Sequence, residues 1–176
     1  RVCYYSDFIS KRLSLSPKDR HEIRIASYLH DIGKIGISNR FINKKGTLSP
    51  TEWAIIKQHT KKSIELLVPL NLSSSILSYI QHHHERFDGT GYPDGLTGDQ
   101  IPLGARIIAI SDAYDSMTSD RPYRKPLSNG EAKNEMLKYA GKQFDSHLIS
   151  IFLELLKEME EVFLVRDHVR IPSFAY

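Results

Sequence analysis

Five of the eight histidines fall between positions 30 and 84, where they stand with carboxylates in groups that could bind metal ions. Imidazole and carboxylate ligands together suit Fe, Mn, Zn or Ni. No cysteine lies among them, which argues against a structural zinc site. The groups are His30-Asp31, His59, His82-His83-His84 and Asp112.

Three of these candidates fall on helical stripes of apolar or small residues. The stripe neighbours are Ile23 and Ala26 for His30, Ile56 and Ser63 for His59, and Ala105 and Ile108 for Asp112. A carboxylate on an apolar helix face is costly unless it is paired or bound to a metal. Three such placements on three predicted helices indicate one shared buried site.

Each candidate taken singly has a commoner explanation. A lone His59 would more often be a hydrogen-bonded core histidine, the run 82–84 a solvated surface tract, and Asp112 the partner of an arginine. Their joint occurrence with His30-Asp31 favours metal binding. Neighbouring residues of a helix point about 100° apart, so His30 and Asp31 can reach a metal pair with the carboxylate bridging. Lys34 lies on the face of His30 and can place an ammonium beside the metals.

Two further segments could bind a ligand. The loop 84–93 contains Gly89 and Gly91, which permit close backbone approach, and Tyr92, which offers a ring and a hydroxyl. The stretch 120–125 supplies guanidinium groups for phosphate oxygens. The plainer explanations are an ordinary surface loop and a solvated basic turn.

The elements that must position these residues are predicted to be helices. Ser16-Pro17 and the capping box Ser49-Pro50-Thr51-Glu52 begin two of them, and the second is expected to continue through Leu67 to a stop at Pro69. Further helices are expected over 73–84, over 103–118 after Pro102, from a second capping box at 128–131, and over about 146–162 after Asp145. No alternating run is long enough for a central strand. The prediction is an all-α bundle of about seven helices. The sequence of 162–176 is ambiguous and is compatible with extended chain.

Composition sets the outer limits. A chain of 176 residues, 40% hydrophobic and 26% charged, is predicted to form one globular domain. A formal charge of +3, with both signs interspersed, argues against binding DNA or RNA polymers and against membrane adhesion. The single cysteine, Cys3, excludes a disulfide within the chain and makes the cytoplasm the expected location. Because residue 1 is Arg, we expect the chain to be part of a longer protein.

The motifs together resemble the HD-GYP family, a subgroup of the HD phosphohydrolase superfamily. The resemblance runs from Arg1-Val2 to about Phe152, so we expect a catalytic domain over 1–161 and a C-terminal extension over 162–176. A bare His-Asp pair would be a weak signal, whereas an ordered set at these spacings is specific. The set is HDIGK at 30–34, HHERFDGTGYPDGL at 83–96, IPLGARIIAISDAYDSMTSDRPYRKPL at 101–127 and GKQFD at 141–145.

The resemblance implies an HD-domain helical bundle that hydrolyses the bacterial second messenger cyclic di-GMP to pGpG or GMP with two-metal activated water. It implies Fe or Mn as the metals, with Zn or Ni as alternatives. Asp31 would bridge the metals and Lys34 would contact the scissile phosphate. The implied metal ligands are His30, Asp31, His59, His83, His84 and Asp112. The implied substrate contacts are Lys34, the signature loop Gly91-Tyr92-Pro93, Arg121 at the other phosphate and Arg124.

The chain departs from the family pattern at several points. The histidine, and in some members the glutamate, that support a third metal would precede Arg1, so we expect two metals. Ser63 replaces a usual glycine and Lys45 a usual proline, and we expect both to be surface or packing changes away from the metals. His82 precedes the matched pair and is not assigned as a ligand.

Other functions stay open at this stage. The domain could be a catalytically weak signalling module that binds a cyclic dinucleotide, or that contacts diguanylate cyclase (GGDEF) domains through the signature loop. It could hydrolyse another nucleotide, such as cyclic GMP-AMP. Di-iron oxygen chemistry also occurs on HD bundles, but the basic stretch 121–125 favours phosphate. The sequence also leaves open whether the chain forms a homodimer.

Overall fold

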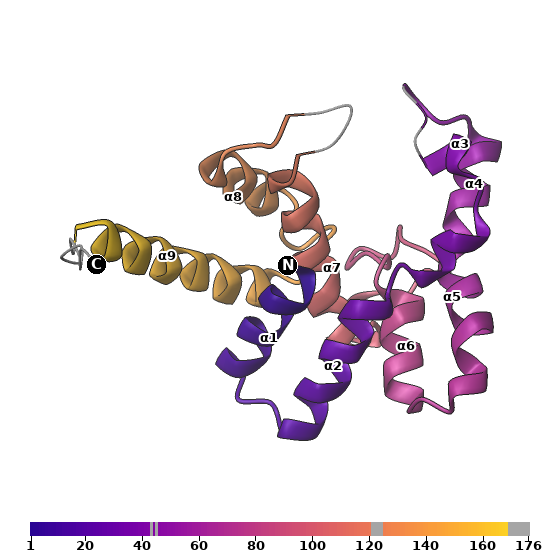
Figure 1. Cartoon of the computed structure of the whole chain (residues 1–176), viewed down its shortest axis with the longest axis horizontal. Coiled ribbons are helices and arrows are strands. Elements are labelled where there is room, and N and C mark those ends of the chain that lie inside the picture. The colour runs from indigo at the N-terminus through magenta and orange to yellow at the C-terminus, as the bar shows by residue number, and fades with distance from the viewer. Residues whose placement is uncertain (43, 45, 121–124, 169–176) are drawn as a thin grey trace, which may run out of the picture.

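The computed structural model describes residues 1–42, 44, 46–120 and 125–168, with side chains placed up to residue 160. These residues form helices joined by short connections (Figure 1), and the described part contains no β-strand beyond two isolated bridges. The predicted all-α architecture is confirmed. The α-helices are α1 Val2–Arg12, α2 Pro17–Leu29, α3 Asn39–Ile42, α4 Pro50–Lys57, α5 His59–Leu67, α6 Ser74–His82, α7 Leu103–Thr118, α8 Asn129–Lys138 and α9 Ser146–His168, and the 3-10 helices are η1 Ile32–Gly36, η2 Val68–Leu70 and η3 Gly98–Gln100.

Most predicted helix starts are found where the sequence places them. Both capping boxes form, at Ser49 with Glu52 and at Ser128 with Glu131, and each serine accepts a hydrogen bond from the backbone N–H three residues later. The helix predicted over 103–118 has those same bounds. Side-chain oxygens at these positions satisfy backbone donors that a helix cannot satisfy itself, which is why the signals are readable from sequence.

The helix expected to run from 50 to 67 is instead divided at Gln58 into α4 and α5. The imidazole Nδ1 of His59 lies 2.7 Å from the Ile56 carbonyl oxygen, and the Thr60 hydroxyl donates to the Lys57 carbonyl. These side chains occupy carbonyls that a continuous helix would pair with its own N–H groups, so the helix ends there. Pro69 lies in the 3-10 turn that follows α5.

The two ends of the chain also differ from the expectation. Helix α1 was not assigned from sequence. Helix α9 continues to His168, through the predicted boundary at 161–162, so 162–168 is helical rather than extended. Residues 169–176 and Lys45 lie outside the described residues.

Helix α7 occupies the centre of the structure and separates two apolar clusters (Figure 1). Its Ile107, Ile110 and Tyr114 belong to a cluster formed with α1, α8 and α9. Its Ile108 belongs to a second cluster with residues of α2, α5 and α6. Because neighbouring positions on α7 are buried on both sides, the helix cannot rotate without disrupting a core, and this fixes the direction of Asp112.

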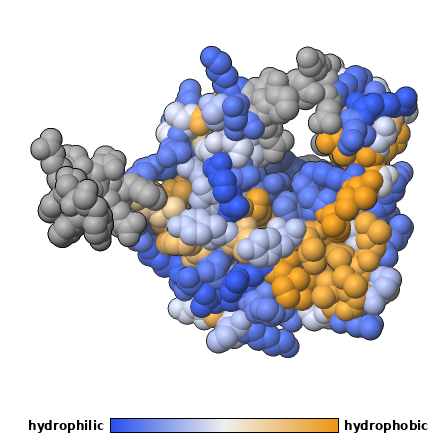
Figure 2. Space-filling model, in the orientation of Figure 1, coloured by the Kyte–Doolittle hydropathy of each residue, from blue (hydrophilic) through white to orange (hydrophobic). Residues whose placement is uncertain are grey.

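The surface is mostly polar, but apolar side chains gather over the ends of α5 and α6 (Figure 2). Leu66, Val68 and Leu70 are each at least half exposed there. Among the described residues, no helix combines the length and the apolar character that crossing a bilayer requires.

The central position of α7 yields a stability prediction. Ile107 is fully buried, so Ile107→Ala should lower the free energy of unfolding by about 2–5 kcal/mol. Leu137→Ala removes a side chain that is 54% exposed and should cost far less. Urea titrations followed by circular dichroism measure both. Equal losses for the two variants would contradict the assigned core.

Candidate metal centre

Three of the predicted ligands stand at the carboxyl ends of helices. His30 is the C-cap residue of α2, His83 is the C-cap residue of α6, and His59 directly follows Gln58, the C-cap residue of α4. The carbonyl end of a helix carries a partial negative charge, which favours a nearby cation. Helices α2, α4 and α6 therefore bring both ligands and favourable dipoles to one place.

The same three imidazoles are oriented by their own helices. Each Nδ1 lies 2.7–2.8 Å from the carbonyl oxygen three residues earlier: Ser27 for His30, Ile56 for His59 and Ile80 for His83. A carbonyl can only accept, so each Nδ1 must be the protonated nitrogen. The lone pair then sits on Nε2, the atom that is free to bind a metal.

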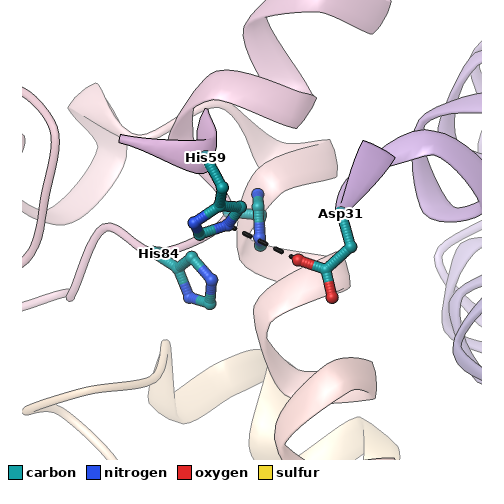
Figure 3. Close-up of side chains that lie close together, drawn as sticks. Asp31, His59 and His84 are labelled. Atoms are coloured by element: carbon teal, nitrogen blue, oxygen red, sulfur yellow. Dashed lines mark ion pairs between the residues drawn. The ribbon is translucent and has the colours of Figure 1, made fainter. Parts of the chain in front are cut away.

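One half of the site is a compact group of four residues, Asp31, His59, His83 and His84. Each offers a ligand atom, and these atoms all lie within 4.8 Å of one another. Figure 3 shows the Asp31 carboxylate pointing toward the rings of His59 and His84. The distance from Asp31 Oδ1 to His59 Nε2 is 3.4 Å.

The other half lies on the opposite oxygen of the same carboxylate. His30 Nε2 is 3.5 Å from Asp31 Oδ2 and 3.7 Å from Asp112 Oδ1. Asp31 thus faces His59 with one oxygen and His30 with the other. This is the arrangement that a bridging carboxylate between two ions would require, and all six predicted ligands are brought together.

The donors fit a divalent metal on physical grounds. The Nε2 atoms of His30, His59 and His83 and the Oδ1 atom of Asp31 are buried and make no hydrogen bond among the described residues. A buried polar atom without a partner is costly, and four that converge call for a common partner. Imidazole with carboxylate binds Fe, Mn, Zn or Ni.

The protonation states suit the same purpose. Burial lowers the pKa of His59, and burial together with the neighbouring imidazoles lowers the pKa of His83 and of His84 well below the usual histidine value. These three rings are neutral at pH 7 and can act as ligands. Burial opposes protonation of His30, but the carboxylates of Asp112 and Asp31 outweigh it and raise its pKa.

Both carboxylates are held in the charged form. Burial would raise the pKa of Asp31, but His30 and Lys34 outweigh this and lower it. Burial likewise opposes ionisation of Asp112, but the nearby His30 ring, with Nε2 3.7 Å from Oδ1, lowers its pKa. The ammonium of Lys34 lies 2.5 Å from Asp31 Oδ2, which puts a cation at the edge of the centre as the sequence predicts.

Ser63 has a different role from the one expected. It is fully buried, its hydroxyl accepts a hydrogen bond from the Gly33 N–H at 2.9 Å, and it donates to the His30 carbonyl at 3.3 Å. A Cβ atom on Gly33 would lie 2.1 Å from the His59 carbonyl oxygen, so only glycine fits between η1 and α5. Ser63 does not face the ligands, but it fastens the segment that carries Asp31 and Lys34.

The signature loop forms one wall of the centre. Tyr92 stacks on the His84 ring with 4.9 Å between centroids, and burial raises the pKa of its phenol, which stays protonated. Gly91 passes so close to Glu85 that a Cβ would lie 2.5 Å from the Glu85 Cα. Pro93 follows through a cis peptide bond.

Glu85 was not singled out from the sequence, although it directly follows the histidine pair. Its side chain is buried, and its Oε1 accepts hydrogen bonds from the N–H groups of Asp94 at 2.7 Å and Gly95 at 3.0 Å. A carboxylate before a glycine-rich loop is a signal for such an anchor. His82, by contrast, directs Nε2 to Asp94 Oδ2 at 2.9 Å, away from the cluster.

The centre opens into a cavity of about 410 Å³. Its wall includes His83, His84 and Asp112 from the centre and Tyr92 from the signature loop. It extends to Trp53 of α4 on one side and to Glu135 and Tyr139 of α8 on the other. The predicted phosphate contacts Arg121 and Arg124 lie outside the described residues.

Residues 1–148 match the family described as the HD domain. The chain belongs to the HD domain family. A cyclic di-GMP phosphodiesterase of Thermotoga maritima is 40% identical over 93% of this chain and 45% of its own length. A 3'3'-cGAMP-specific phosphodiesterase of Vibrio cholerae is 41% identical over 72% of this chain and 28% of its own length. The HD-GYP resemblance is confirmed.

A solved structure of a cyclic GMP-AMP specific phosphodiesterase from Vibrio cholerae has the same fold as this HD domain. The TM-score is 0.70 at 21% identity, over 89% of this chain and 43% of that one. The HD domain described here spans less than half the length of the curated relatives that it resembles. Their names therefore describe proteins with additional parts.

The Ser63 contacts predict a stability cost. Ser63→Ala leaves the buried Gly33 N–H unpaired and should lower the free energy of unfolding by about 1–3 kcal/mol. The matched control is Ser150→Ala, which removes an exposed hydroxyl bonded to a carbonyl of its own helix and should change little. Thermal melts compare the two. If Ser63→Ala has the same melting temperature as Ser150→Ala and the parent, the hydrogen bonds of Ser63 to Gly33 and His30 do not contribute to stability.

The adjacent histidines offer a matched test of the metal centre. At a free Mn²⁺ concentration a hundredfold above Kd, binding should stabilise the chain by about 2.7 kcal/mol. His83→Ala removes an inward Nε2 and should abolish most of this increment, whereas His82→Ala removes an imidazole paired with Asp94 and should keep it. Melting with and without Mn²⁺ measures the increment. Equal increments in both variants would place the metal elsewhere.

Proposed function

We propose that this HD domain is a metal-dependent phosphodiesterase that hydrolyses cyclic di-GMP to pGpG or GMP. The observation that carries the proposal is the shared Asp31 carboxylate, which faces imidazoles with both oxygens. It lies beside His83, His84 and Asp112, which line an open cavity. A ligand in that cavity would meet Tyr92 of the signature loop as well as three of the proposed metal ligands. The names of the curated relatives support the substrate class.

Two divalent ions held by His30, Asp31, His59, His83, His84 and Asp112 would activate water and neutralise phosphate charge. We propose Fe or Mn, with Zn or Ni as alternatives, because the donors are imidazole and carboxylate. Asp31, with one oxygen near His59 and the other near His30, would be a ligand shared by both ions. The neutral rings of His59, His83 and His84 need not lose a proton before they bind.

The chain supplies the remaining charge and orientation. The Lys34 ammonium, now paired with Asp31, would donate to an oxygen of the scissile phosphate and stabilise the charge that develops on it. The Tyr92 phenol, kept protonated by burial, can donate a hydrogen bond from the loop wall. Gly91 and Pro93 shape that wall, and Arg121 and Arg124 remain the proposed contacts for the other phosphate.

A second substrate is supported by particular relatives. Three curated phosphodiesterases of Vibrio cholerae, 34–41% identical to this chain, are described as specific for 3'3'-cGAMP. Cyclic GMP-AMP is therefore the runner-up. A binding module without turnover is disfavoured because all six proposed metal ligands lie close together.

Several associated proposals stay predictions. We place the domain in the cytoplasm, where a cyclic dinucleotide messenger acts. We still propose a catalytic domain over 1–161 and an extension over 162–176, although helix α9 runs across this boundary. Contact between the signature loop and diguanylate cyclase domains remains a prediction from the family resemblance. A homodimer remains a prediction as well.

Turnover of cyclic di-GMP by the chain loaded with Fe²⁺ or Mn²⁺, followed by product chromatography, tests the function. Lys34→Met should lower kcat by about 10²–10³-fold because a charge facing the reacting phosphate is lost. Lys61→Met, which removes an exposed lysine of α5, should keep the parent rate.

Asp31→Ala is the inactive reference for that assay. Cyclic di-GMP turnover by Asp31→Ala that equals the parent rate would refute the proposed mechanism. Tight cyclic di-GMP binding by the metal-loaded parent without any product would favour the binding module instead.

A further inference from the structure

The cavity beside the metal centre continues past the ligands to the base of α8. At this end its wall is formed by Met117 of α7, Glu135 and Tyr139 of α8, and Gln143 and Phe144 of the following turn. None of these residues was assigned a role above. In Figure 1, α8 rises on one side of α7 and α4 on the other, so the two ends of the cavity belong to separate elements.

The polar groups at the α8 end are placed by the fold. Ala132 and Met136 of α8 are fully buried, and this sets Glu135 at the cavity wall in a half-buried position. Glu135 Oε2 accepts a hydrogen bond from Lys138 at 2.8 Å, and no hydrogen bond within the described residues uses its Oε1. The side-chain oxygen Oε1 of Gln143 accepts from Arg86 at 2.8 Å, which leaves the N–H groups of its side-chain amide as donors.

The apolar groups provide flat or soft contact faces. Tyr139 is 39% exposed, so one face of its ring is accessible from the cavity side. Met117 contributes a polarizable thioether, and Phe144 contributes an aromatic edge. A planar heterocycle between such groups gains stacking and dispersion energy whichever base it is. The choice of base must therefore come from the polar groups.

We propose that this end of the cavity is a guanine-binding subsite, in which Glu135 accepts hydrogen bonds from the N1–H and the exocyclic amine of guanine. Gln143 donates to an acceptor on the same base. Adenine presents an unprotonated N1 where guanine presents a donor, so the carboxylate faces a lone pair. The inference rests on the proposed cyclic dinucleotide substrate and specifies which base it must contain.

The opposite end of the cavity is built differently. Trp53 is 44% exposed there and lies edge-on to Tyr92 at 6.4 Å, with the Lys57 ammonium 5.0 Å from the Tyr92 ring. Trp53 and Tyr92 offer aromatic faces here, whereas the lining carboxylate of Glu85 is buried and accepts from the N–H groups of Asp94 and Gly95. One base is selected as guanine and the other is only stacked, so cyclic di-GMP and cyclic GMP-AMP are both accepted and cyclic di-AMP is not.

Turnover of the three cyclic dinucleotides by the metal-loaded chain tests the selection. The parent should show kcat/KM for cyclic di-GMP and cyclic GMP-AMP at least about tenfold above that for cyclic di-AMP. Glu135→Gln should lower both of these kcat/KM values about tenfold, through KM rather than kcat, and leave cyclic di-AMP unchanged. Glu65→Gln on α5 removes the same charge from an exposed position away from the cavity and should match the parent.

A binding measurement separates the subsite from the reaction. Calorimetric titration of the metal-free chain with GMP and with AMP should show GMP binding about tenfold tighter, and Glu135→Gln should remove the difference. Lys138→Ala keeps the acceptor carboxylate and should retain the preference, which controls for disturbance of α8.

The outcomes are distinct. Cyclic dinucleotide turnover with a guanine preference that survives Glu135→Gln, or with no preference in the parent, overturns the subsite and leaves the proposed function standing. No turnover of any cyclic dinucleotide, together with Glu135-dependent GMP binding, overturns the proposed function and supports the subsite.

Discussion

The partial burial of the Asp31 carboxylate, whose Oδ1 is out of contact with water, is the constraint on which the rest of the structure depends. A carboxylate removed from water is costly unless cations or donors surround it. Here its neighbours are Lys34, a His30 ring with a raised pKa and three uncharged imidazoles that have lone pairs to share. Buried ligand atoms that make no hydrogen bond among the described residues converge on this carboxylate, which fits a site for a divalent ion better than a structural ion pair.

The fold surrounds Asp31 with imidazoles that lie at the ends of helices. The C-terminus of α2 supplies His30, the end of α4 precedes His59, and the C-terminus of α6 supplies His83. Helix α7, locked between two apolar clusters, supplies Asp112. The ligands are therefore fixed by the packing of four separate helices, and the geometry of the centre inherits the precision of the core.

Much of this could be predicted from the sequence because its signals are local. Capping boxes at Ser49 and Ser128 and the bounds of α7 depend on neighbouring residues, and so does the pattern that places His30 and Asp112 on buried faces. The break at Gln58 could not be predicted, because it depends on a side chain that takes a carbonyl from its own helix. The same limit hid Ser63: its partners, Gly33 and the His30 carbonyl, lie about thirty positions away along the chain.

The break at Gln58 has a mechanical consequence as well as a chemical one. It turns α4 into a separate short element whose main packing partners are α3 and α5, whereas α8 packs on both α7 and α9. Trp53 therefore lies on a short helix that a single turn connects to α5. Glu135 lies on α8, which packs against both α7 and α9. The Ile56 carbonyl that orients His59 belongs to α4, so any widening of the cavity at the Trp53 side would be felt at the proposed metal centre, whereas the Glu135 side has no such link through its own helix.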